Sequence, residues 1–141
     1  MLDPGRWAPR SGKARVVVEN PDGSELSGYA EALRSAGYDV ATCSGPGAGE
    51  GSRSLCPLVE TGHCSLVDGA DVVVSTSALP EIRSILAALG SRSSPRVVFE
   101  APAPAFDKYR DVAGDAFLVA CPITEEILCR RVAQALPPSG T

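Results

Sequence analysis

Five short runs typical of β-strands, separated by stretches with helical spacing, constrain the fold of this chain more than any other feature. The first run, Ala14–Glu19, reads Ala-Arg-Val-Val-Val-Glu, which is typical of a strand buried on both faces of a sheet. Strands that alternate with helices form a parallel sheet, because right-handed crossovers place the helices on both faces. The predicted fold is therefore α/β, a three-layer αβα sandwich around a five-stranded parallel sheet. The other four strands are expected over Tyr38–Cys43, Asp71–Ser75, Arg96–Glu100 and Ala116–Cys121.

The intervening stretches carry helix signals. Apolar residues recur at helical spacing from Leu26 to Leu33, and Gly37 follows as a stop, because glycine adopts the left-handed cap conformation without a Cβ clash. Pro80 suits the first turn of a helix, and two glutamates after Pro122 suit the positive end of another. Helices are expected over residues 24–36, 80–89 and 122–136, with a short turn around 66–67 and at most a short helix over 106–112.

The composition predicts one folded domain. The chain has 141 residues, of which 44% are hydrophobic and 21% are charged, as in ordinary globular proteins. We place the domain at residues 14–136, with a flexible arm over residues 1–13 and a flexible tail over residues 137–141. Residues 44–70 form an insert that opens with glycine at positions 45, 47, 49 and 51. That glycine run predicts a flexible loop, and the following residues 55–67 are expected to dock near the second and third strands.

Charge and hydropathy exclude several classes of partner. The formal net charge is −4, and Arg130-Arg131 is the only adjacent basic pair, so no direct contact with nucleic acid is expected. No apolar run approaches the roughly 20 residues that cross a bilayer, and the first ten residues lack the apolar core of a signal peptide. These features predict a cytoplasmic protein with no membrane contact. Five cysteines, an odd number, fit a reducing compartment better than a disulfide framework.

Four residues in or beside the insert leave three interpretations open. Cys43, Cys56, His63 and Cys64 could hold zinc, although their spacing matches no known finger. Cys56 and Cys64 could instead form a redox-active pair across a reversal at Gly62. The thiols could also be small apolar side chains that pack the loop onto the sheet.

No motif indicates an enzyme or a cofactor. The glycine loop lacks the lysine and the hydroxyl residue of a P-loop, and no nucleophile elbow surrounds a serine. Cys121 is followed by Pro122, and Ile127 stands where a Cys-x5-Arg phosphatase carries its arginine. We therefore predict a protein that acts by binding.

Four segments, taken in order and spacing, resemble the receiver domain of bacterial response regulators. Val16–Asn20 matches the first strand with its acidic pair, and Ala36–Val40 the glycine-aromatic entry to the second strand. Asp71–Pro80 matches the third strand through its Leu-Pro, and Ala113–Ile123 the fifth strand and its following turn. The resemblance covers residues 14–136 and implies a flavodoxin-like fold and a role in two-component signalling.

The resemblance also implies a phosphorylation site, which this chain alters. Receivers bind a cation with two acids, use an aspartate as nucleophile, and contact the phosphoryl group with a hydroxyl and a lysine. Here one acid is Glu19, but the other positions carry neutral or mismatched groups. The residues at the five positions are Glu19, Asn20, Thr76, Glu100 and Cys121. We expect the scaffold without aspartyl phosphorylation.

Output would then pass through protein contacts, either with a partner or between two copies. In the resembled family, the surface of the fourth helix, fifth strand and last helix commonly mediates dimerisation. Two other functions stay open: a redox or metal sensor at the cysteines, and a small-molecule binder where the strands end. The interface residues implied here are Tyr109, Arg110, Phe117, Arg130 and Arg131.

Overall fold

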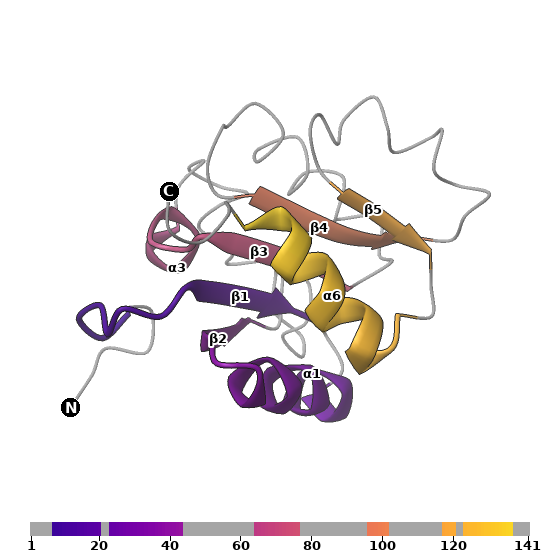
Figure 1. The fold of residues 1–141 in the computed structure, drawn as a ribbon, viewed down its shortest axis with the longest axis horizontal. Helices are drawn as coiled ribbons and strands as arrows, with labels where there is room; N and C mark the ends of the chain where they lie inside the picture. Colours follow the sequence, from indigo (N-terminus) through magenta and orange to yellow (C-terminus); the bar gives the residue numbers. More distant parts are fainter. Residues whose placement is uncertain are drawn as a thin grey trace, which may run out of the picture.

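A computed structural model describes residues 7–20, 23–43, 64–76, 96–101, 117–120 and 123–136. Five parallel strands form one sheet in the order β2-β1-β3-β4-β5, which confirms the predicted α/β class and sheet (Figure 1). The strands end within one or two residues of their predicted bounds. They are β1 (Arg15–Glu19), β2 (Asp39–Cys43), β3 (Val72–Ser75), β4 (Arg96–Ala101) and β5 (Phe117–Ala120).

Valines build the centre of the sheet. Val17 of β1 lies beside Val73 of β3, and the two are 3% exposed or less. Val98 of β4 is fully buried. Leu118 of β5 is only partly buried, because β5 is the last strand of the sheet and has no neighbour on its outer side among the described strands.

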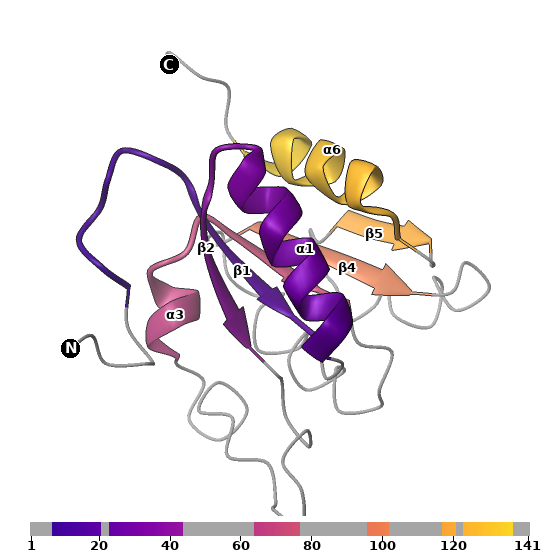
Figure 2. The ribbon, with the colours of Figure 1, turned by 90° about the horizontal axis from the view of Figure 1, so that it is seen from below.

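Two helices cover one face of the sheet. These are α1 (Gly23–Ser35) and α6 (Glu125–Ala135), which lie side by side (Figure 2). The apolar positions predicted for each helix supply the buried stripe, with Leu33 and Leu128 fully buried. They pack against the valines of β1, β3 and β4 that point to the same face.

The ends of these helices follow their cap chemistry. Gly37 has φ +101°, the left-handed conformation that its position predicted. The last helix begins later than Pro122, because Thr124 is its N-cap and accepts a hydrogen bond from the backbone N–H of Ile127 over 3.1 Å.

The opposite face carries α3 (Ser65–Asp68), the short helical turn predicted around Leu66–Val67. Val67 is buried against Val17, Val73 and Phe99, so this end of the insert docks on the sheet. The chain therefore forms three layers, with α1 and α6 on one side and α3 on the other (Figure 2).

Residues 7–13, which belong to the segment expected to be a loose arm, make specific contacts with the domain. The indole N–H of Trp7 donates to the backbone oxygen of Leu66 over 2.8 Å, and the Arg15 guanidinium lies 5.3 Å from the centre of the Trp7 ring. Arg10 contacts Asp71 through both carboxylate oxygens, at 3.2 and 3.3 Å. These contacts place the arm against α3 and the amino ends of the strands.

Several predictions fall outside the described residues. These are the helix over 80–89, the short helix over 106–112, the glycine loop and the tail. Among the residues that are described, no helix is long and apolar enough to cross a membrane.

Candidate functional site

The carboxyl ends of β1 and β3 bring three of the predicted site residues together. Glu19 is paired in register with Ser75, and the backbone N–H of Thr76 donates to the Glu19 oxygen over 3.0 Å. Asn20 follows directly, and its own N–H donates to the oxygen of Cys43 on β2. Parallel strands end at one edge of the sheet, so their last residues become neighbours despite being 56 positions apart.

The side chains at this edge form a buried hydrogen-bond network. The Asn20 amide donates to the Thr76 hydroxyl over 2.8 Å and to the Glu25 carboxylate over 3.0 Å. The Thr76 hydroxyl donates in turn to the backbone oxygen of Glu19 over 2.8 Å. Ser75 donates to the Glu19 carboxylate over 2.8 Å. Glu19, Asn20, Ser75 and Thr76 are each at most 7% exposed, so the bonds among these four residues are shielded from water, whereas Glu25 is exposed.

Glu100, at the end of β4, contacts the backbone rather than this network. Its carboxylate accepts a hydrogen bond from the N–H of Ile123 over 2.6 Å, and the Tyr29 hydroxyl donates to the oxygen of the same residue over 3.2 Å. The Ile123 side chain is 4% exposed within the core. The segment that leads into α6 is therefore fixed by hydrogen bonds to β4 and α1 and by the burial of the Ile123 side chain in the core.

Several carboxylates lie near the Ile123 clasp, by which we mean the two hydrogen bonds from Glu100 and Tyr29 to the backbone of Ile123. Burial raises the pKa of Tyr29 to about 12, because the phenolate would lose its hydration. Three carboxylates add to that rise: Glu100, Glu25 and Glu125. Burial likewise raises the pKa of Glu100, opposed by the Ile123 N–H and assisted by Glu25.

A hollow of about 450 Å³ opens between the first turns of α1 and α6. It lies at the strand-end edge that the small-molecule alternative invoked. Its lining residues are Ser24, Glu25, Gly28, Tyr29, Ile123, Thr124 and Glu125.

Sequence reasoning did not select several residues of this site. Glu25, Tyr29 and Ile123 all make the bonds described above. Tyr29 was assigned only to the apolar stripe of its helix, since nothing in the sequence links it to a residue 94 positions away. For Glu25, the signal was available: it lies in the first turn of the helix that follows the acid-amide pair.

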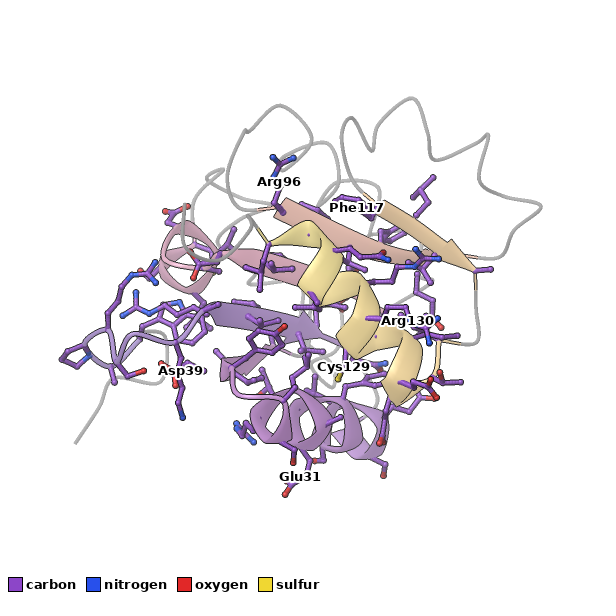
Figure 3. The ribbon with its side chains drawn as sticks, in the orientation of Figure 1. Glu31, Asp39, Arg96, Phe117, Cys129 and Arg130 are labelled. Atoms are coloured by element: carbon purple, nitrogen blue, oxygen red, sulfur yellow. The ribbon has the colours of Figure 1, made fainter. Side chains whose placement is uncertain are left out.

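The cysteines give a mixed outcome. Cys43 and Cys64 are partly buried and pack against the core cluster that also contains Val67 of α3. Cys56, His63 and Cys121 lie outside the described residues. Within the described ranges, no group of three or more histidine, cysteine, aspartate or glutamate side chains could hold a metal ion. Cys129 contacts the Ala32 oxygen on the side of α6 that faces α1 (Figure 3).

The implied interface residues are distributed over β5 and α6. Phe117 packs partly against the core, and Arg130 and Arg131 are exposed (Figure 3). Arg130 forms an ion pair with Glu126 at 3.0 Å, one helical turn away, and Arg131 donates to Gln134. The other two residues, Tyr109 and Arg110, lie outside the described part.

No known protein family and no curated protein matches the sequence. Solved structures do match the fold. The chemotaxis protein CheY4 of Vibrio cholerae shares 18% identity at a TM-score of 0.63, covering 88% of this chain and 99% of CheY4. An orphan response regulator of H. pylori shares 15% identity at a TM-score of 0.65, covering 89% and 98%. The beryllofluoride-activated receiver domain dimer of NtrC4 shares 16% identity at a TM-score of 0.61, covering 86% and 95%. The chain therefore has the CheY-like, flavodoxin-like α/β fold.

Proposed function

We propose that this chain is a non-enzymatic, receiver-like regulatory domain of the cytoplasm that signals through protein contacts without aspartyl phosphorylation. The observation that carries the proposal is the buried bond between Asn20 and Thr76. In the resemblance these two positions hold a cation-binding acid and the nucleophilic aspartate. Here a neutral amide and a neutral hydroxyl bond to each other instead.

The chemistry of phosphoryl transfer supports this proposal. A carboxylate nucleophile needs a nearby cation to neutralise the incoming phosphoryl oxygens, and Mg²⁺ is usually bound through one or two carboxylates together with waters and phosphate oxygens. Among the described residues at the ends of β1 and β3, only Glu19 has an ionisable side chain, and its carboxylate accepts from Ser75. The nearby carboxylate of Glu25, on α1, accepts from the Asn20 amide. The Thr76 proton is directed to a backbone carbonyl rather than to a base.

The clasp on Ile123 supports the second half of the proposal. In the resemblance, the position of Glu100 carries the hydroxyl that contacts the phosphoryl group. A carboxylate there already has a partner, the Ile123 N–H, so the approach to α6 is held without any phosphoryl group. We infer that the domain stays in one signalling conformation and that its partner or a second copy reads that conformation on β5 and α6. The dimer formed by the NtrC4 receiver domain supports self-association as the simplest contact.

Incubation with acetyl phosphate and Mg²⁺ tests the loss of phosphorylation. We expect no mass gain in the parent chain, measured by intact-protein mass spectrometry. The double variant Asn20→Asp with Thr76→Asp restores both carboxylates and serves as the control for the assay. A stoichiometric phosphoryl adduct on the parent, released by hydroxylamine, would contradict the proposal.

Sedimentation over a range of concentrations tests the contact surface. If two copies associate through α6, the double variant Arg130→Glu with Arg131→Glu weakens the dimer, whereas Glu31→Lys on the outer side of α1 does not (Figure 3). If the chain is a monomer at every concentration, the contact is with a different protein. Binding to that protein should then be weakened by the α6 double variant and not by Glu31→Lys.

A further inference from the structure

The amino ends of the strands carry a second hollow, at the opposite edge from Glu19 and Thr76. It has a volume of about 510 Å³, within the range of roughly 300–1,000 Å³ of small-molecule sites. It lies between the arm, the start of β2 and the end of α1. Apolar wall is supplied by Trp7, Pro9, Tyr38 and Val40.

The arm side of this hollow is preformed. Trp7 is fixed by its hydrogen bond to Leu66, and Arg10 by its two contacts with Asp71. Ser11 donates to the Asp39 carboxylate over 2.7 Å, which ties the arm to the first residue of β2. A wall that is already held in place binds a ligand without first losing conformational entropy.

Two cations line the hollow. Lys13 and Arg34 are both exposed, and neither forms an ion pair with a carboxylate of the described ranges. The one bond that Arg34 makes there is a long one of 3.4 Å to the oxygen of Val40. The single carboxylate of the lining is Asp39, and it accepts from Ser11. On a chain with a net charge of −4, this is a local excess of positive charge beside aromatic side chains.

We propose that this hollow binds a small organic anion with a flat apolar body. The guanidinium of Arg34 and the ammonium of Lys13 would bind the carboxylate, sulfonate or phosphate group, and the aromatic walls would contact the rings. A guanidinium offers two parallel N–H donors that match such a group. The site lies away from the network at the carboxyl ends, so it is independent of the function proposed above.

Trp7 provides the measurement, because it is the only tryptophan of the chain. The probes are anilinonaphthalene sulfonate and phenylnaphthylamine, which share the same rings but differ in the anionic group. Excitation of Trp7 should produce sensitised emission from the sulfonate probe when it is bound in the hollow. We expect the uncharged probe to bind at least about tenfold more weakly, which is about 1.4 kcal/mol, because it cannot accept the charged hydrogen bonds of the two cations.

Substitutions separate this site from unspecific binding. The double variant Lys13→Gln with Arg34→Gln should weaken the sulfonate probe to the level of the uncharged probe and leave the uncharged probe unchanged. The matched control Arg96→Gln, which removes an exposed cation at the start of β4 outside the hollow, should affect neither. Equal binding of the two probes, absent sensitised emission, or sulfonate binding that survives the double variant would each overturn the proposal. Dissociation of a homodimer on adding the probe would also overturn the proposal, because a second copy of the chain would then be the natural occupant of the hollow.

Discussion

The carboxylate of Glu100 accepts a 2.6 Å hydrogen bond from the backbone N–H of Ile123, which joins the end of β4 to the segment that leads into α6. The oxygen of the same residue accepts from Tyr29 of α1. Both polar groups of one backbone residue are thus bound by side chains of two different elements. This arrangement fixes the start of α6 relative to the sheet and to α1.

The ionisation of Glu100 should reduce stability as pH rises. Burial raises its pKa in the folded protein above the ordinary value of 4.5, so the folded state retains a proton that the unfolded state has released. The contribution of Glu100 to the free energy of unfolding therefore falls from about pH 4.5 upward. Glu100→Gln keeps an acceptor for Ile123 but removes the charge. Urea unfolding at about pH 4 and pH 7 should show that the free energy of unfolding of the variant, relative to that of the parent, is higher at pH 7 than at pH 4.

Glu31→Gln is the control for that measurement, because Glu31 is exposed and points away from the sheet on α1 (Figure 3). Its difference from the parent should be nearly the same at the two pH values. If Glu100→Gln behaved like Glu31→Gln, the clasp on Ile123 would carry no pH dependence.

Tyr29 should lose its phenolic proton only at strongly alkaline pH. Its pKa of about 12 lies above the ordinary value of 10, so the folded state keeps the phenolic proton while the unfolded state loses it. Stability is therefore lost as pH rises between these two values. Absorbance of phenolate should show one late step that disappears in Tyr29→Phe. A titration of that variant identical to the parent's would exclude Tyr29 as its source.

The arm should be sensitive to one added methyl group. A Cβ at Gly69 would lie 2.9 Å from the Cδ1 atom of Trp7, so Gly69→Ala must move the indole ring off α3. We expect Trp7 emission to shift to the red and fluorescence quenching by acrylamide to increase. Gly23→Ala is the matched control, since a Cβ there meets nothing within 4 Å. Unchanged emission in Gly69→Ala would mean that Trp7 does not rest on α3 in solution.

The sheet could be predicted because its signal is local. Each valine run specifies a strand by itself, and parallel strands bring Asn20 and Thr76 to one edge without further information. The contacts that could not be predicted join residues without a shared pattern. Trp7 lies among proline and glycine in a segment with no periodicity, and its partner Leu66 is 59 positions away. Glu100 could be placed at a strand end, but not on the backbone of Ile123, because the path of the intervening chain decides that contact.

Burial predicts the order in which core truncations destabilise the protein. Val98→Ala removes two methyl groups from a fully buried site and should cost on the order of 1–4 kcal/mol. Leu118→Ala removes a larger group but from the partly buried strand β5, so we expect a smaller cost than at Val98. Chemical denaturation of both variants decides the order. A larger loss at Leu118 would show that an unseen partner surface buries β5 in solution.

Thr76 tests whether the network at the carboxyl ends is structural. Thr76→Val keeps the shape of the side chain but removes both hydrogen bonds of the hydroxyl, which deprives Asn20 of one acceptor in a buried site. Leaving a buried donor without that acceptor should lower the free energy of unfolding by about 1–3 kcal/mol. Thr76→Ser keeps the hydroxyl and should cost less. Thr42→Val, at an exposed position of β2, should change stability by less than about 0.5 kcal/mol. If Thr76→Val were as stable as Thr42→Val, the hydroxyl would be free to serve a ligand, and the case for a purely structural network would fail.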